Sequence, residues 1–275
     1  MEQRTAKEPF AMVPMTSLRS REKPRKRGLT MMMDWGLPLG QQGDWLDLLA
    51  PSVDLAKFVV GTSRLYEEDY LKRKINLYKS HDVHAFIGGQ FLEFVYSSQG
   101  LAAAKPFFEE AKRLGFEAIE VSDNVVAIDG ETKNTLVQMA VDCGLEVHGE
   151  VGSKSDETGA AQLIAEANEF FGAGAGVVLV EGAELLIDGE PNRRLLSELS
   201  DGMDTSKVIF ELIGPWIPGT HHCDVYDLKK FLIAEFGPDV NLANVMPEHV
   251  WETEALRVGL SVTGPSVLAK ATAAE

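Results

Sequence analysis

The sequence predicts an α/β fold, namely a parallel, eight-stranded (β/α)8 TIM barrel. Short apolar runs rich in β-branched residues recur eight times, and their first residues are 26 to 35 positions apart. Longer amphipathic stretches separate these runs, and strands that alternate with helices form parallel sheets. A doubly wound sheet alternates in the same way, but the first turn, Asp34–Pro38, lacks the glycine-rich phosphate loop of that fold.

The expected strands are the apolar runs themselves: Leu29–Met33, Leu55–Val59, Val83–Ile87, Ala118–Val121, Leu145–Val151, Val177–Val180, Val208–Phe210 and Val240–Ala243. Helices are expected where apolar residues recur at helical spacing: Asp44–Leu49, Glu67–Lys79, Ala102–Leu114, Gly130–Cys143, Ala160–Phe171, Asn192–Leu199, Asp224–Phe236 and Glu248–Val258. Glycine readily adopts the left-handed backbone of a helix end, so Gly115, Gly144 and Gly172 are expected to terminate three of them.

We expect the chain to comprise a basic lead-in, residues 1–27, and a single (β/α)8 catalytic domain, residues 28–275. The lead-in contains eight Lys and Arg but three Glu. Its prolines, Pro9, Pro14 and Pro24, discourage a helix and favour an extended path. A nucleic-acid or membrane arm and a transit peptide are the alternatives, and the Glu residues argue against the acid-poor composition of a transit peptide.

Composition restricts the partners. The net charge is −16, and residues 28–275 contain 18 basic and 39 acidic side chains. Such a body repels nucleic-acid phosphates and anionic lipid, and no apolar run approaches the roughly 20 residues of a membrane span. Cys143 and Cys223 form no metal or redox spacing, which is typical of reduced thiols. We therefore expect a cytoplasmic protein that binds a small-molecule substrate and neither nucleic acid nor membrane, with a homo-oligomer left open.

Four glutamates end four successive predicted strands: Glu120, Glu150, Glu181 and Glu211. In a (β/α)8 barrel, active-site groups come from the carboxyl ends of the strands. Carboxylates that converge on one barrel mouth repel one another and are costly to bury, and a hard divalent cation such as Mg²⁺ resolves both problems. The sequence therefore predicts a Mg²⁺ site made by these glutamates. The alternative is that some of them pair with Lys or Arg, or face solvent.

Two lysines are the candidate catalytic cations. Lys57 lies inside an apolar strand, where it is expected to pair with a glutamate or to hold an anionic substrate, although a purely structural ion pair is the alternative. Lys154 follows Glu150 in the stretch GEVGSK, and the glycine two residues before it lets the chain fold the amine over the mouth. A solvated loop lysine is the alternative for Lys154.

Further polar groups and glycines at the predicted strand ends are candidate substrate contacts: Asp34, Thr62, Ser63, Gly88, Gly89, Ser122, Asn241 and Asn244. Trp216 lies between two prolines in the loop after the seventh strand and is a candidate wall of the mouth. His221 and His222 are expected to be surface histidines, because adjacent ligands suit a single ion poorly. His148 is expected to be packed inside its strand.

These residues resemble a known family, phosphosulfolactate synthase. The resemblance extends from about residue 23 to residue 261. The matching stretches are Lys23–Arg25, Gly28–Thr30, Asp34, Gly36, Pro38, Lys57–Phe58, Gly61–Ser63, Gly88–Gly89, Gly115–Asp123, Glu150–Gly152, Lys154, Lys207–Glu211, Asn241–Asn244 and Glu254–Arg257.

The resemblance implies a Mg²⁺-dependent barrel enzyme, a carbon–sulfur lyase that adds sulfite to phosphoenolpyruvate to give 2-phospho-3-sulfolactate. Sulfite attacks the methylene carbon, and charge builds on the substrate carboxylate as an enolate that a metal stabilises. An acid then protonates C2, and the resemblance implies Lys154 for that role. It also adds Arg257 to the expected substrate contacts.

The sequence departs from the family pattern at four places. Ala183 and Ser261 stand where the family tends to carry arginine, Gln90 replaces a threonine, and Val59–Val60 replace an aromatic residue and a glycine. Arginines are the usual bidentate holders of phosphate and sulfonate. Two alternatives follow: a related enolate-forming lyase with a less anionic carboxylate substrate, or a non-catalytic interaction or stress protein. Retention of Lys57, Lys154 and the glutamates argues against the latter.

Overall fold

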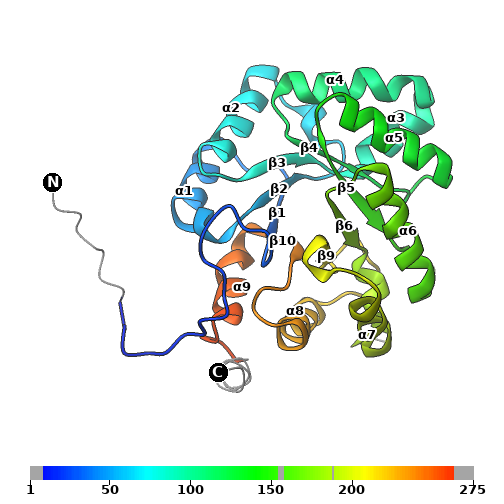
Figure 1. Cartoon of the computed structure of the whole chain (residues 1–275). Helices are drawn as coiled ribbons and strands as arrows, with labels where there is room; N and C mark the ends of the chain where they lie inside the picture. Colours follow the sequence, from blue (N-terminus) through cyan, green and yellow to red (C-terminus); the bar gives the residue numbers. More distant parts are fainter. Residues whose placement is uncertain (1–8, 154–157, 188, 263–275) are drawn as a thin grey trace.

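A computed structural model describes residues 9–153, 158–187 and 189–262. Eight parallel strands close into a barrel that is surrounded by helices (Figure 1). In order around the barrel the strands are β1 (Thr30–Asp34), β10 (Leu242–Val245), β9 (Val208–Glu211), β6 (Val177–Val180), β5 (Glu146–Val151), β4 (Ala118–Val121), β3 (His84–Ile87) and β2 (Leu55–Phe58). The TIM-barrel prediction is confirmed, and every expected strand is present with bounds within two residues of those predicted.

The helices are α1 (Leu39–Leu49), α2 (Glu68–Lys79), α3 (Gly89–Gln99), α4 (Ala104–Leu114), α5 (Gly130–Asp142), α6 (Ala160–Ala173), α7 (Arg193–Gly202), α8 (His222–Phe236) and α9 (Val250–Arg257). Short 3-10 turns are η1 (Ala50–Ser52), η2 (Thr62–Leu65), η3 (Leu101–Ala103), η4 (Gly182–Leu185), η5 (Thr205–Lys207) and η6 (Pro247–His249), and β7 (Leu186–Ile187) pairs with β8 (Glu190–Pro191) in a small antiparallel sheet. No helix among these residues is long and apolar enough to cross a membrane.

Four details of the helix prediction are wrong, and one of them is the end of α7, which lies at Gly202 instead of Leu199. Helix α3 was not expected, because Gly88–Gly89–Gln90 resembles a turn rather than a helix start. Helix α1 begins at Leu39 instead of Asp44. Helix α6 continues through Gly172 to Ala173, and the left-handed residue that ends it is Gly174, with φ of 116°.

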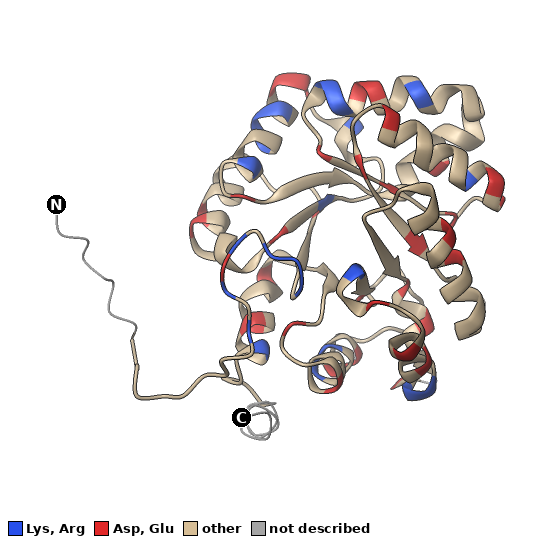
Figure 2. Cartoon of the chain, in the orientation of Figure 1, with Lys and Arg blue, Asp and Glu red and all other residues tan. Residues whose placement is uncertain are grey.

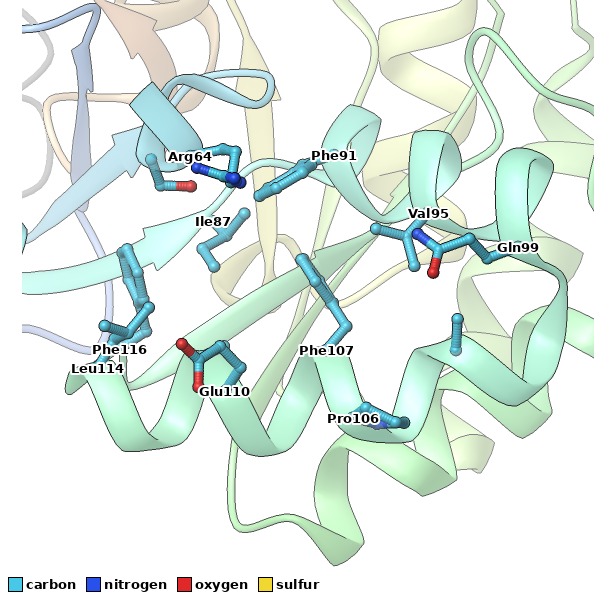
Figure 3. Close-up of a pocket in the computed structure, with 13 residues that line it drawn as sticks. Arg64, Ile87, Phe91, Val95, Gln99, Pro106, Phe107, Glu110, Leu114 and Phe116 are labelled. Carbon is cyan, nitrogen blue, oxygen red and sulfur yellow. The ribbon is translucent and has the colours of Figure 1, made fainter. Parts of the chain in front are cut away.

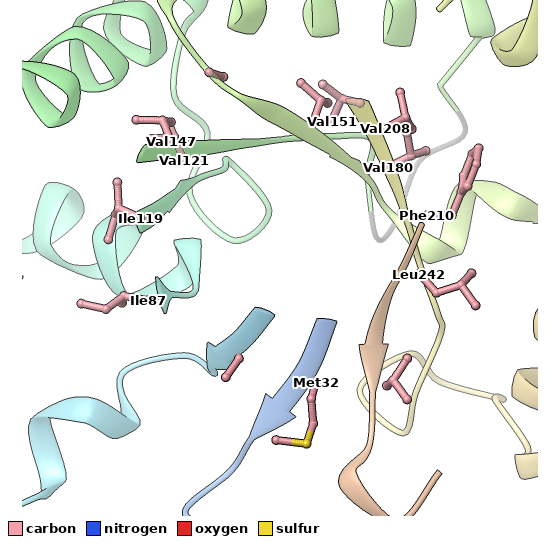
Figure 4. Packing of buried hydrophobic residues seen from close by; sticks show 14 of the residues in the cluster. Met32, Ile87, Ile119, Val121, Val147, Val151, Val180, Val208, Phe210 and Leu242 are labelled. Carbon is pink, nitrogen blue, oxygen red and sulfur yellow. The ribbon is translucent and has the colours of Figure 1, made fainter. Parts of the chain in front are cut away.

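The apolar core has two layers, one inside the barrel and one outside it. Leu29, Met31, Phe86, Ala118, Leu179, Ile209 and Ala243 fill the interior. Met32 belongs to the outer layer, since successive residues of a strand point to opposite faces. Figure 4 shows outward-pointing residues such as Ile119 and Val180 on their strands, where the helices cover them. Both faces of the strands are therefore buried, as in other parallel barrels.

Charged residues concentrate on the outer helices and loops (Figure 2). Residues 9–29 form no helix or strand, and cations of this segment contact the amino end of the barrel. Buried Arg19 pairs with Glu254 at 3.0 Å, and Arg25 pairs with Asp54 at 2.8 Å. Lys23 donates to two backbone carbonyls of the β1–β2 connection, those of Ala50 and Val53.

Candidate active site

A cavity of about 170 Å³ opens at the carboxyl end of the barrel. It is lined by residues of five strands and of the loops and helix that follow strands: Met33, Trp35, Lys57, Val59, Val60, Gly88, Gly89, Gln90, Asn124, Glu150, Glu211, Trp216 and Asn244. Trp35 and Trp216 contribute the aromatic part of this lining. The position agrees with the expectation that active-site groups lie at this end of a (β/α)8 barrel.

A buried cluster of one lysine and three glutamates forms the polar floor of the mouth. The Lys57 Nζ lies 2.8 Å from Glu120 Oε2 and 3.1 Å from Glu211 Oε1. One carboxylate oxygen from each of Glu120, Glu150 and Glu211 lies within 4.8 Å of the other two. Each of these glutamates is 2% exposed, so three carboxylates and one ammonium share a space shielded from water.

Burial and neighbouring charges shift the pKa of two groups in this cluster. Burial alone would lower the pKa of Lys57, but the carboxylates of Glu120, Glu211 and Glu150 raise it well above its ordinary value. Lys57 is therefore an ammonium. Burial also raises the pKa of Glu120 to about 7, although Lys57 opposes this shift and Glu150 adds to it. Glu120 can thus exchange a proton near neutral pH.

The donors of this cluster fit a hard divalent cation. Glu120, Glu150 and Glu211 are the group of potential metal ligands found among the described residues, and they offer oxygen atoms alone. With Lys57 charged and the glutamates ionised, the cluster carries a charge of −2, which a divalent cation would balance. The Lys57 ammonium contacts two of the three carboxylates but balances a single negative charge.

Glu181, the fourth predicted ligand, lies outside that group. Its carboxylate is buried and accepts a hydrogen bond from the Ala183 backbone N–H at 3.3 Å, at the start of η4. Nearby, the Glu184 carboxylate accepts from the Ser153 N–H at 2.8 Å and the Thr158 N–H at 2.9 Å. Glu184 thereby holds both ends of the loop that contains Lys154. Lys154 itself lies outside the described residues.

The sequence analysis assigned no role to Glu93, which positions the loop after β4. Its fully buried carboxylate accepts from Ser122 Oγ at 2.5 Å and from the Val125 and Val126 N–H groups at 2.7 and 2.9 Å. Ser122 is therefore engaged with Glu93. A Cβ on the neighbouring Gly89 would overlap Ser122 Oγ, so glycine is needed there. The Gly89 N–H donates to Glu120 Oε1 at 2.8 Å.

The structure places Asp34 away from the cavity, in a buried polar cluster behind β1. Its carboxylate accepts from Tyr78 Oη at 2.8 Å, pairs with the fully buried Lys74 at 2.8 Å, and accepts from the Gly36 and Leu37 N–H groups. Asp34 therefore fixes the loop that carries Trp35 into the mouth.

Asn241 and Arg257 lie at the amino end of the barrel, opposite the mouth. Asn241 Oδ1 accepts from the Leu29 N–H at 2.9 Å, and its Nδ2 donates to the Val208 carbonyl at 2.8 Å. Fully buried Arg257 donates to the Pro238 and Val240 carbonyls, both at 2.6 Å. Burial, and secondarily Arg19, lower the pKa of Arg257 to about 9. Both side chains join strand ends there.

Asn244, Gly88 and Gly89 do line the cavity. Asn244 has a left-handed backbone, with φ of 58°, and its Nδ2 donates to the Leu212 carbonyl at 3.4 Å. Its Oδ1 is buried and has no hydrogen-bond partner among the residues that the structure describes. Thr62 Oγ1 donates to the Val59 carbonyl at 2.8 Å, and Ser63 lines a different pocket, on the barrel flank.

The histidines take no visible part in the cluster. His148 is packed inside the barrel against Phe86, with ring centroids 4.6 Å apart. Burial, with Lys57 and then His84, lowers the pKa of His148 to about 3, so the ring is neutral. His221 and His222 are exposed, as predicted.

Comparison with known proteins identifies relatives over most of the chain. A model of the (2R)-phospho-3-sulfolactate synthase (ComA) family matches residues 19–263. The phosphosulfolactate synthase of Methanocaldococcus jannaschii is 34% identical over 246 residues, which are 86% of this chain and 92% of the relative. That of Methanothermobacter thermautotrophicus is 32% identical over 249 residues, which are 86% of this chain and 91% of the relative.

Two more distant similarities were found. The Arabidopsis thaliana protein named Heat-stress-associated 32 is 24% identical over 264 residues, which are 86% of this chain and 87% of that protein. Among solved structures, 3-hexulose-6-phosphate synthase from Salmonella typhimurium has a TM-score of 0.53 at 15% identity, and the match covers 88% of this chain and 99% of that one. This structural similarity supports the barrel fold alone.

Proposed function

The chain belongs to the phosphosulfolactate synthase family, and from that premise we propose that it is a Mg²⁺-dependent lyase that adds sulfite to phosphoenolpyruvate to give 2-phospho-3-sulfolactate. The observation that carries the proposal is the buried cluster of Lys57, Glu120, Glu150 and Glu211 at the barrel mouth. We further propose a cytoplasmic enzyme, in keeping with its two free cysteines.

The three glutamates of the cluster would hold the metal ion. When bound there, Mg²⁺ supplies positive charge that stabilises the negative charge developing on the substrate carboxylate. Phosphoenolpyruvate is itself strongly anionic, and the cluster without a metal carries a charge of −2 when its three glutamates are ionised. Binding of this substrate therefore requires added positive charge at the mouth.

Lys57 contributes a fixed ammonium beside the reacting carboxylate. Its contacts with Glu120 and Glu211 hold the Nζ in place, and its raised pKa keeps it charged throughout the neutral range. A preorganised cation in a site shielded from water stabilises developing charge better than a mobile one. Lys57 thus orients the substrate and stabilises charge rather than transferring a proton.

In the proposed reaction a C–S bond forms first, and a proton is then transferred to C2. A lone pair of the sulfite sulfur attacks C3 of phosphoenolpyruvate, and the electrons of the C2–C3 double bond move toward the carboxylate. C2 subsequently takes a proton, which we assign to Lys154. Glu184 supports this assignment indirectly, because it anchors Ser153 and Thr158 on either side of the segment that contains Lys154.

One observation favours a second candidate, a related lyase that acts on a less anionic carboxylate substrate. Among the described residues that line the mouth, Lys57 is the cation, and no arginine is present. Ala183 contributes a backbone N–H to Glu181, and Ser261 Oγ lies 3.2 Å from Tyr226 Oη. Neither position offers the bidentate anion contact that arginine gives.

Product formation tests the proposal directly. The purified protein, with Mg²⁺, sulfite and phosphoenolpyruvate, is expected to produce phosphosulfolactate, followed by ³¹P NMR. Lys154→Ala should lose most of that rate, while Lys72→Ala, on an exposed face of α2, should retain it. Absence of product despite stabilisation by Mg²⁺ in a thermal melt would transfer the assignment to the second candidate. Absence of both would support a non-catalytic interaction or stress protein, and one relative is named for an association with heat stress.

A further inference from the structure

A second pocket, here called the side pocket, lies on the flank of the barrel. It is bounded by η2, the last residue of β3, and helices α3 and α4 (Figure 3). Its volume is about 510 Å³, three times that of the mouth cavity and typical of small-molecule sites. Phe91 and Phe107 meet edge to face in its wall, with ring centroids 5.1 Å apart, and Ile87 and Phe116 extend the apolar surface.

Two hydrogen-bond donors lie at the η2 side of this apolar wall. Arg64 is exposed and has no side-chain hydrogen bond or ion pair with any residue that the structure describes. Figure 3 shows its guanidinium beside the Phe91 ring. The adjacent Ser63 is buried, and its Oγ likewise has no partner among the described residues. A buried hydroxyl without a partner is costly, so a ligand that accepts its proton gains free energy.

The acidic residue of the side pocket does not cancel this donor pair. Glu110, on α4, is held by Arg113, with an N–O distance of 2.6 Å, and these hydrogen bonds with Arg113 lower the pKa of Glu110. Its charge is therefore already compensated from outside the pocket. Arg64 remains as the cation available to a ligand, and a carboxylate matches its planar donors.

We propose that the side pocket binds a small carboxylic acid with an apolar body. The carboxylate accepts hydrogen bonds from Arg64 and from Ser63 Oγ, and an aryl or branched alkyl body packs against Phe91 and Phe107. Nothing in this assignment depends on the reaction at the mouth.

The side pocket shares its walls with the mouth. Val60 lines the mouth and precedes Ser63 by three residues in the same loop. Helix α3 contributes Gly89 to the mouth, where its N–H donates to Glu120, and Phe91 to the side pocket. A ligand in the side pocket thus contacts the loop after β2 and helix α3, which both contribute residues to the mouth. A ligand bound there would act as an effector rather than as a substrate.

Calorimetric titration of the full chain with 3-phenylpropionate tests the site, and 3-phenylpropanamide provides a neutral ligand of the same size. The acid is expected to bind at least tenfold more tightly than the amide. Arg64→Gln should weaken the acid about tenfold, as expected for loss of a charged hydrogen bond, and leave the amide unchanged. Arg73→Gln is the matched control, because Arg73 is an exposed arginine of α2 outside the pocket, and it should bind like the wild type.

A second variant tests the apolar part of the site without relying on charge. Ala103→Phe places a ring in the pocket lining and should abolish binding of both ligands, while thermal melts verify that each variant is folded. Equal affinity for acid and amide, unchanged affinity in Arg64→Gln, or no binding of the acid at millimolar concentration would overturn the assignment.

Discussion

Replacement of Lys57 by methionine should destabilise the protein severely, although Met is similar in length and apolar. The change removes the ammonium that lies 2.8 Å from Glu120 and 3.1 Å from Glu211. With an effective dielectric constant of about 20, Coulomb's law gives roughly 6 and 5 kcal/mol for the two contacts. The variant no longer has to bury the Lys57 ammonium away from water, and this offsets part of the lost Coulomb energy. Removal of one partner of a buried pair typically costs about 3–5 kcal/mol.

We expect a loss of about 3 kcal/mol in the free energy of unfolding at pH 7.5, at the lower end of that range. The reason is that burial already raises the pKa of Glu120 to about 7, and without Lys57 this pKa rises further. A carboxylate with a raised pKa in the folded state stabilises the fold when protonated, and this contribution is lost as the pH rises through that pKa. The deficit of the variant should therefore shrink when the pH falls from 7.5 to 5.5.

Urea unfolding, followed by circular dichroism at both pH values, measures this deficit. Lys72→Met is a suitable control, because Lys72 pairs with Glu68 at 2.6 Å on the surface, and exposed pairs contribute little. A loss below about 1 kcal/mol for Lys57→Met, or a loss that grows on acidification, would show that the cluster does not depend on this ammonium.

Three further predictions concern residues around the cluster. Glu184→Gln should weaken the hydrogen bonds that anchor Ser153 and Thr158. Proteolysis between these two residues should then accelerate several-fold, while the melting temperature changes little. An unchanged cleavage rate would contradict the anchoring role of Glu184. His148→Gln should reduce the loss of stability on acidification by about 1.4 kcal/mol per pH unit below pH 6.5. The reason is that His148 binds a proton in the unfolded chain, whereas its pKa of about 3 keeps it neutral in the folded protein. Chemical denaturation at pH 5 and 7.5 measures this slope, which would stay the same in the variant if the ring were accessible. Gly149→Ala should lower the free energy of unfolding, measured in urea, by about 1–3 kcal/mol, because a Cβ there would lie 2.5 Å from the Phe170 ring of α6. Gly159→Ala is the control, since there is open space around Gly159. Equal stability of the two variants would exclude the clash.

The strand pattern was predictable from sequence because β-branched apolar runs at regular spacing suit strands that are buried on both faces. Helix α3 was missed because its first residues are Gly89 and Gln90, directly after another glycine, and that composition is typical of turns. The helix nevertheless forms, since its apolar residues Leu92 and Val95 are buried against the barrel. Tertiary packing here outweighs local propensity.

Arg257 and Asn241 illustrate placement errors with a topological cause. Helices of a (β/α)8 barrel run antiparallel to the strands, so the last residue of α9 returns to the amino end, and Arg257 is that residue. This placement follows from the predicted fold alone. Strand β10 begins at Leu242, two residues later than expected, so Asn241 precedes the strand instead of lying within it. Strand ends are hard to place from sequence, and an error of two residues moves a side chain by a full strand period.

The side-chain alternation of the strands separates the acids that face the mouth from those that hold loops. The side chains of Met31 and Met33 point into the barrel, whereas that of Met32 points outward. Successive residues of a strand alternate between the two faces, so the Asp34 side chain also points outward. Asp34 accordingly pairs with Lys74 outside the barrel. Glu120, Glu150 and Glu211 lie within their strands at positions whose side chains point into the barrel, and their carboxylates meet at the mouth.

Glu181 has inward alternation relative to Leu179, yet it follows the last residue of β6, where the chain turns into η4 and its carboxylate bonds to Ala183 N–H. Two conditions must therefore both hold for a carboxylate to join the cluster, namely inward alternation and a place inside the strand. Alternation can be read from the sequence, whereas the residue at which hydrogen bonding to the neighbouring strand stops depends on the loop that follows. This is why the sequence predicts a ring of four glutamates while the structure brings three of them together.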